Sequence, residues 1–186
     1  MAPKFIAFHF LAPGFVSQAI FFLSLLCFTV LAMIVHELGH WWAARQCGVS
    51  VSELGFGLGP RLGGVRLGAM NFSLRAIPVA SFLRIDGSGL SERPLAQQLF
   101  VHLGGIIFNL VFGMLTFGTP LGGINLLLAL GNVLPLYKHD GWKCGLLLMR
   151  ALMRRPSKSV EWTFTASGCF VSVIVLDALL HLFQFK

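Results

Sequence analysis

Long apolar stretches alternate along the chain with short polar segments. A helix needs about 20 apolar residues to cross the hydrocarbon core of a bilayer. Stretches of roughly this length lie at about 15–37, 98–118, 121–137 and 160–183, and the third of them is the shortest. The pattern predicts an all-α polytopic membrane protein with about four transmembrane helices.

The segment of about 45–95, between the first two predicted spans, has a different pattern. Its glycine-rich part at 55–64 argues against a helix. Residues 70–76 alternate apolar and polar side chains, as in a half-buried strand, and 65–67 provide a partner across a turn at Gly68 and Ala69. The segment therefore predicts a membrane-associated β-hairpin. The apolar residues 77–85 predict a further strand or a re-entrant loop.

The composition agrees with a membrane protein and excludes an ordinary soluble domain. Hydrophobic residues make up 56% of the chain and charged residues 11%, and the mean hydropathy is +0.80. A soluble domain would be about one quarter charged. No internal repeat or separate soluble domain is evident, so residues 1–186 are expected to form a single integral membrane domain.

Positive charge predominates, since 14 Lys and Arg against 7 Asp and Glu give a net charge of +7. The basic residues form no run interleaved with aromatic residues, which argues against nucleic acid as a partner. They gather in the segment 45–95 and in the stretch between the third and fourth spans. The positive-inside rule places both segments in the cytoplasm. Both termini, with Lys4 and Lys186, are then predicted outside it, and a bacterial inner membrane is the expected location.

The first apolar stretch ends in His36-Glu37-Leu38-Gly39-His40, an HExxH motif. In a helix, residues i and i+4 lie on one face about one turn apart, so the two imidazoles can bind one metal ion. A catalytic zinc takes three protein ligands and leaves the fourth position for water. Glu37 is placed to remove a proton from that water. Ionisable side chains in an apolar span are costly, which favours a functional interpretation over a solvated helix end.

A third ligand is expected near the end of another span. Asp140 fits, because it follows the third predicted span, with Pro135 to kink the helix before it and Gly141 to let the chain turn after it. His139 competes as a ligand, but adjacent residues on a helix point about 100° apart. An interfacial polar role is therefore favoured for His139.

The ligands predicted from these residues are His36, His40 and Asp140, which would hold one zinc ion per chain. Iron or cobalt could also occupy a site of two histidines and one carboxylate, but the adjacent Glu37 favours zinc.

The sequence resembles the site-2 protease family of intramembrane zinc metalloproteases. The two signatures of that family are HExxH in an early span and NxxPxxxxDG in a later one, and both occur here in that order, at 36–40 and 132–141. The stretches at 55–62 and 77–84 are also similar to segments of that family, as are Leu103, Gly104 and Gly105 with Asn109. The likeness covers about residues 20–150.

The resemblance implies that His36, His40 and Asp140 bind zinc, that Glu37 is the catalytic base, and that Asn132 contacts the substrate or the transition state. It also implies a core of membrane helices with the hairpin beside the active site. The turn between the second and third spans is too short for the PDZ-like module that some relatives insert there. A minimal form without a PDZ or CBS domain is therefore expected.

The expected function is regulated intramembrane proteolysis, in which a zinc metalloendopeptidase hydrolyses peptide bonds within or near transmembrane segments. A substrate helix must unwind locally before water can reach its carbonyl, and the hairpin is expected to hold the unwound segment as an added strand. The expected partners are a transmembrane protein substrate and the lipid bilayer, with a regulatory membrane protein as a further candidate.

Two other functions share part of this pattern. A non-proteolytic membrane protein that binds or transports a metal ion would use the same ligands, but it has no need of Glu37. A zinc protease of another membrane family would share HExxH without requiring NxxPxxxxDG. Among the other polar residues of the spans, Asn109 and Asn125 are expected to be packing residues, and His102 is expected to lie outside the site.

Overall fold

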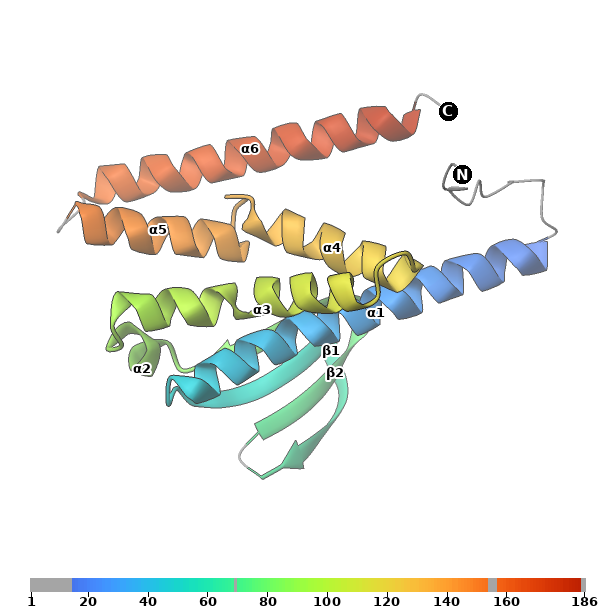
Figure 1. The fold of residues 1–186 in the computed structure, drawn as a ribbon, viewed down its shortest axis with the longest axis horizontal. Helices are drawn as coiled ribbons and strands as arrows, with labels where there is room; N and C mark the ends of the chain where they lie inside the picture. The colour runs from blue at the N-terminus through green and yellow to red at the C-terminus, as the bar shows by residue number, and fades with distance from the viewer. Residues whose placement is uncertain (1–14, 69, 154–156, 185–186) are drawn as a thin grey trace.

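A computed structural model of the chain describes residues 15–68, 70–153 and 157–184. The predicted turn residue Ala69 and the terminal residues Lys4 and Lys186 lie outside these ranges. The described elements are, in chain order, α1 (Phe15–Gln46), β1 (Val51–Leu67), β2 (Met70–Ile85), α2 (Gly87–Ser91), α3 (Leu95–Leu115), α4 (Pro120–Val133), α5 (Asp140–Leu152) and α6 (Lys158–Gln184) (Figure 1). The structure is mainly helical with one hairpin between the first two long helices, as predicted.

Three of the described helices are long and apolar enough to cross a membrane. They are the Ser17–Gln46 part of α1, α3, and the Lys158–Ala178 part of α6. Large apolar side chains stay exposed on all three, among them Phe22, Leu110 and Ile174. Extensive exposed apolar surface of this kind marks contact with a membrane or another protein. The remaining predicted span, the third, corresponds to α4, which is apolar but has only 14 residues.

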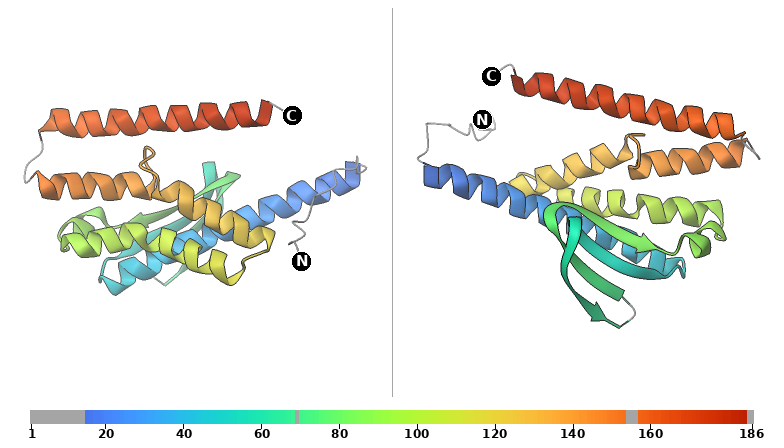
Figure 2. Two further views of the ribbon diagram at one scale, coloured as in Figure 1. Left: turned by 45° about the horizontal axis from the view of Figure 1, so that its top comes forward. Right: turned by 180° about the vertical axis from the view of Figure 1, so that it is seen from behind.

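The third predicted span, at about 121–137, ends earlier than predicted. α4 ends at Val133, and a separate helix, α5, begins at Asp140. Pro135 has no backbone N–H and disfavours helical geometry in the residue before it, and Leu134 is accordingly extended, with ψ 142°. In every view α4 and α5 follow one another in nearly the same direction beside α3 (Figures 1 and 2). Together they form one helical path with a break in its middle.

α1 and α3 pack closely because small residues face each other. A Cβ at Gly39 would overlap the carbonyl oxygen of Gly104, and a Cβ at Gly104 would lie 2.9 Å from Cβ of Ala43. This contact presses the turn of α1 that carries HExxH against α3. Close to it, a small buried cluster gathers around the end of α1: Ala43, Ala44, Cys47, Val49, Leu90 and Val101.

The predicted hairpin is confirmed, and its strands are longer than predicted. β1 and β2 pair antiparallel, with Leu67 opposite Met70 beside the turn and Val51 opposite Ile85 at the far end. Residues 77–85 are therefore a strand, one of the two forms predicted for them. A hydrogen bond of 2.6 Å from Ser73 to the buried Glu53 links the strands and holds the pKa of the Glu53 carboxyl below its usual value. The sheet lies against α1 (Figure 2).

Candidate metal centre

Two histidines of α1, His36 and His40, lie one turn apart on the face toward α3. Because α1 continues to Gln46, the HExxH motif lies inside the helix and not at its end, where it was predicted. Both side chains are buried, with 9% and 7% of each residue exposed. Their Nε2 atoms are 3.1 Å apart.

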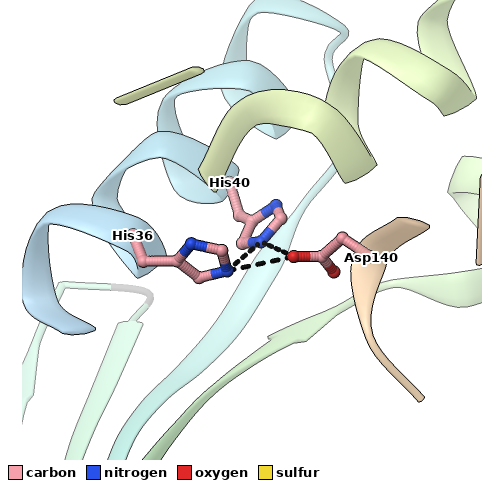
Figure 3. A group of neighbouring side chains, drawn as sticks. All are labelled: His36, His40 and Asp140. Atoms are coloured by element: carbon pink, nitrogen blue, oxygen red, sulfur yellow. Dashed lines mark hydrogen bonds and ion pairs between the residues drawn. The ribbon is translucent and has the colours of Figure 1, made fainter. Parts of the chain in front are cut away.

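Asp140 meets these histidines from the opposite side of the site (Figure 3). It is the first residue of α5 and is only 3% exposed. Its Oδ2 lies 3.0 Å from Nε2 of His36 and 3.0 Å from Nε2 of His40. The fold thus brings together the three residues that the sequence predicts as ligands, although about 100 positions separate Asp140 from the histidines.

The geometry of this group fits a zinc ion. Two imidazole nitrogens and one carboxylate oxygen are the donor set of many catalytic zinc sites. Bonds of about 2.0–2.1 Å in a tetrahedron require donors about 3.3 Å apart, so the observed 3.0–3.1 Å would have to open by only a few tenths of an ångström. Among the residues that the structure describes, this is the one group of three or more such side chains close enough to share a metal ion.

Each of the three side chains is held by a second contact. His36 Nδ1 lies 3.3 Å from Nδ2 of Asn109, and His40 Nδ1 lies 2.7 Å from the carbonyl oxygen of Val101. The ammonium of Lys143 pairs with Oδ1 of Asp140 at 2.9 Å, which leaves Oδ2 directed at the histidines. Such outer contacts orient metal ligands and are typical of functional metal sites.

The connection before α5 places Asp140 by a tight approach to the end of α4. A Cβ at Gly141 would overlap the carbonyl oxygen of Val133, so a side chain there would push the two helices apart. His139, the competing ligand, directs Nδ1 to the carbonyl oxygen of Gly131 at 3.0 Å. It therefore supports the connection and does not join the three clustered side chains.

Glu37 lies beside the three candidate ligands and is 6% exposed. Its Oε1 accepts a hydrogen bond of 2.7 Å from Oγ of Ser81 in β2. The hairpin therefore borders the site directly, through the second half of β2.

A cavity of about 410 Å³ opens over these residues. Asn132 is among the lining residues, and its Nδ2 donates to the carbonyl oxygen of Leu128 at 2.9 Å. The complete lining is His36, Glu37, His40, Ser81, Phe82, Leu83, Ile85, Gly87, Leu90, His102, Asn132, Lys138, His139, Asp140 and Lys143.

Four polar residues at the site were not predicted from the sequence. Ser81 was assigned no role, and Lys143 was expected only as a basic residue of the cytoplasmic stretch after the third span. His102 was expected outside the site but lines the cavity, and Asn109 contacts His36 in addition to packing. The spacing of Lys143 three residues after Asp140, one helical turn, is a signal that could have been used. The other three reach the site only through tertiary packing.

Comparisons with known proteins agree with this site. The family model of peptidase family M50 matches residues 21–121, more than half of the chain, and the match includes HExxH but ends before Asp140. Similar curated proteins, each provisionally described as a zinc metalloprotease, occur in Helicobacter pylori (34% identity over 110 residues, 52% of this chain and 32% of that protein), Clostridium perfringens (32% over 102 residues, 50% and 30%) and Fusobacterium nucleatum (31% over 93 residues, 46% and 27%).

The matched segments cover about a third or less of these relatives' own length. No PDZ-sized insertion separates α3 from α4, because α3 ends at Leu115 and α4 begins at Pro120. The apolar helices and the family match together indicate an integral membrane protein of a metallopeptidase family. The chain therefore belongs to peptidase family M50, the site-2 protease family that its two motifs resemble.

Proposed function

We propose that the chain is an intramembrane zinc metalloprotease that hydrolyses peptide bonds within or near transmembrane segments of other membrane proteins. The observation that carries this proposal is the position of Glu37. A buried carboxylate shares one cavity with two imidazoles and a second carboxylate that fit a zinc ion. A site that only bound or transported a metal would not need this additional base.

One zinc ion held by His36, His40 and Asp140 would supply Lewis acidity, which polarises a peptide carbonyl and makes water a better nucleophile at neutral pH. Glu37 takes the proton of the attacking water and then delivers it to the nitrogen of the leaving amine. Ser81 donates a hydrogen bond to Oε1 of Glu37 and so orients the carboxylate that accepts the proton.

Asn132 is the proposed contact to the developing oxyanion. It lines the cavity, and its Nδ2 would have to turn from the carbonyl oxygen of Leu128 toward the substrate. A single well-placed hydrogen bond to an oxyanion is worth about 3–4 kcal/mol.

The unwound substrate segment is proposed to pair with the second half of β2. Phe82, Leu83 and Ile85 line the cavity, and residues 81–84 pair with β1 on one side. A substrate strand added to the other side would lie beside Glu37. Proline substituted in turn at residues 82–85 should reduce cleavage at the positions whose N–H pairs with the substrate, and unchanged cleavage at all four would contradict this binding mode.

We further propose that α1, α3 and α6 cross a bacterial inner membrane and that α4 and α5 together make a fourth crossing. The break between α4 and α5 then places Asp140 within the membrane, level with the second half of α1, where His36 and His40 lie. Irregular backbone is tolerated at such depth where it is buried in protein or lines a polar cavity, and discontinuous helices often carry ion sites there. A regulatory membrane protein that gates access is a further proposed partner.

The test is cleavage of single-span reporter proteins by the wild type, by Glu37→Gln and by the surface control Glu92→Gln, with zinc content measured in each purified protein. Cleavage by the wild type and the control, its loss in Glu37→Gln with zinc retained, and its loss on chelation would support the proposal. Equal cleavage by Glu37→Gln would contradict the role of Glu37. Bound zinc with no cleavage of any reporter would favour the metal-binding alternative.

A further inference from the structure

Asn109 of α3 lies against the rear of the His36 ring. The residue is fully buried, and its Nδ2 is 3.3 Å from Nδ1 of His36. Its Oδ1 is also buried and has no hydrogen-bond partner among the described residues. A buried carbonyl oxygen without a partner costs free energy, so the position of this amide requires an explanation.

The chemistry of metal binding supplies one. A neutral imidazole carries a single ring proton, so a histidine that binds a metal through Nε2 must keep its proton on Nδ1. The Nδ1–H of such a ligand is generally donated to a carboxylate, a carbonyl or water. His40 has this arrangement, because its Nδ1 lies 2.7 Å from the carbonyl oxygen of Val101.

For His36 the hydrogen-bonding neighbour of Nδ1 within the described residues is the Asn109 amide. The oxygen and nitrogen of an asparagine amide have nearly the same shape and exchange places when the group turns by 180°. In either orientation the end of the amide that points away from His36, whether oxygen or nitrogen, has no hydrogen-bond partner in the described part of the chain. The hydrogen bond to His36 therefore decides which orientation is preferred.

We propose that Asn109 is the positioning residue for His36. With its oxygen turned toward Nδ1, the amide accepts the Nδ1–H hydrogen bond, fixes the tautomer of the ring and directs Nε2 toward Asp140. This inference rests on the proposed metal centre. It assigns a function to a residue outside both the HExxH and the NxxPxxxxDG motifs.

Three variants of the full chain, purified in detergent, test the proposal. Asn109→Leu has nearly the same volume but no acceptor, whereas Asn109→Asp keeps an acceptor oxygen. Asn125→Leu is the matched control, since Asn125 is also fully buried, also has an unpartnered Oδ1 among the described residues, and lies in α4 with its Nδ2 bonded to Leu121. Zinc affinity is measured by competition with a chelator, and the coordination geometry is followed by the visible spectrum of added Co²⁺.

Asn109→Leu is expected to lose about 10- to 100-fold in zinc affinity. Asn109→Asp should keep an affinity and a Co²⁺ spectrum close to those of the wild type, and Asn125→Leu should leave both unchanged. If Asn109 only fills space, Asn109→Asp should bind zinc more weakly than Asn109→Leu, because a buried carboxylate without a hydrogen-bond donor is costlier than a leucine. Weaker binding by Asn109→Asp than by Asn109→Leu would therefore overturn the proposal.

The same titration separates this inference from the proposed function. If the wild type binds neither Zn²⁺ nor Co²⁺, the metal centre itself is refuted, and the role of Asn109 with it. If the wild type binds zinc and Asn109→Leu binds it equally well, only the role of Asn109 is refuted.

Discussion

The two imidazoles of the site fit beside α3 only because Gly105 has no side chain. A Cβ at this position would lie 2.5 Å from Nε2 of His40 and 2.6 Å from Cε1 of His36. Both distances are shorter than van der Waals contact, so an added methyl group must displace the rings from Asp140. The glycine is thus required by the site and not by a turn.

Gly105→Ala should therefore lower zinc affinity by at least about tenfold. Mutation of a residue that only hydrogen-bonds to a metal ligand already lowers metal affinity by about this factor, and here the ligands themselves are displaced. Proteolytic activity should fall with it. Gly123→Ala is the matched control, since Gly123 also lies in a helix but has open space around its Cα. Chelator competition on both variants provides the measurement, and an unchanged affinity in Gly105→Ala would show that the rings can move without losing the metal.

Ser81→Ala should affect catalysis without affecting the metal. The Ser81 hydroxyl donates to Glu37 and to none of the three ligands. Hydrogen bonds to charged groups contribute about 1.5–3 kcal/mol, so loss of this one should reduce kcat by roughly 10- to 100-fold while zinc content stays constant. Ser52→Ala, which removes an exposed hydroxyl from the same sheet, is the control. A parallel loss of zinc would mean that Ser81 supports the metal-ligating group instead.

The break between α4 and α5 shows how far the sequence could predict an element. Pro135 predicted a kink or break in the helix before Asp140. The structure has a break there, because α4 ends at Val133. A second helix beginning at Asp140 was not predicted, because the segment after it contains Trp142, Lys143 and Arg150 and lacks the apolar continuity of a span. The polar side chains of α5 are accommodated by the cavity and by the pair of Arg150 with Glu161, which no local pattern reveals.

The candidate site, too, could be predicted from the sequence only in part. The HExxH spacing reflects metal chemistry and indicates His36, Glu37 and His40, whereas Asp140 was indicated by its place after an apolar span and by the resemblance to the second family motif. Asn109 and His102 lie in α3 and Ser81 lies in β2, and only the packing of these two elements against α1 brings them to the site. Contacts of this kind depend on tertiary structure and leave no periodic signal along the chain.

The close approach of α5 to the end of α4 can be tested at Gly141. A Cβ there would lie 2.6 Å from the carbonyl carbon of Val133 and overlap its oxygen. Gly141→Ala should therefore shift the start of α5, carry Asp140 away from the histidines and reduce zinc affinity, while both helices remain formed. Circular dichroism together with chelator competition would check this, and a fall in helix content instead of zinc affinity would indicate that the break holds the helices together.

The ends of the helices suggest how the whole molecule sits in the membrane. Arg93, before α3, donates to the carbonyl oxygen of Gly48, after α1, so these two ends lie together. Arg150 pairs with Glu161 where α5 passes to α6, and Figure 1 places this junction at the same end of the molecule. The turn at 116–119 lies at the opposite end.

By the positive-inside rule, the end that carries these arginines faces the cytoplasm. In a variant whose native cysteines are replaced, Ser91→Cys should react with a membrane-impermeant thiol reagent only after cells are permeabilised, whereas Phe117→Cys should react in intact cells. Both side chains are exposed, so access depends on the membrane and not on burial. The reverse pattern would invert the orientation. Labelling of both in intact cells would show that α3 does not cross the bilayer, and the proposed cleavage of transmembrane segments would then lose its structural basis.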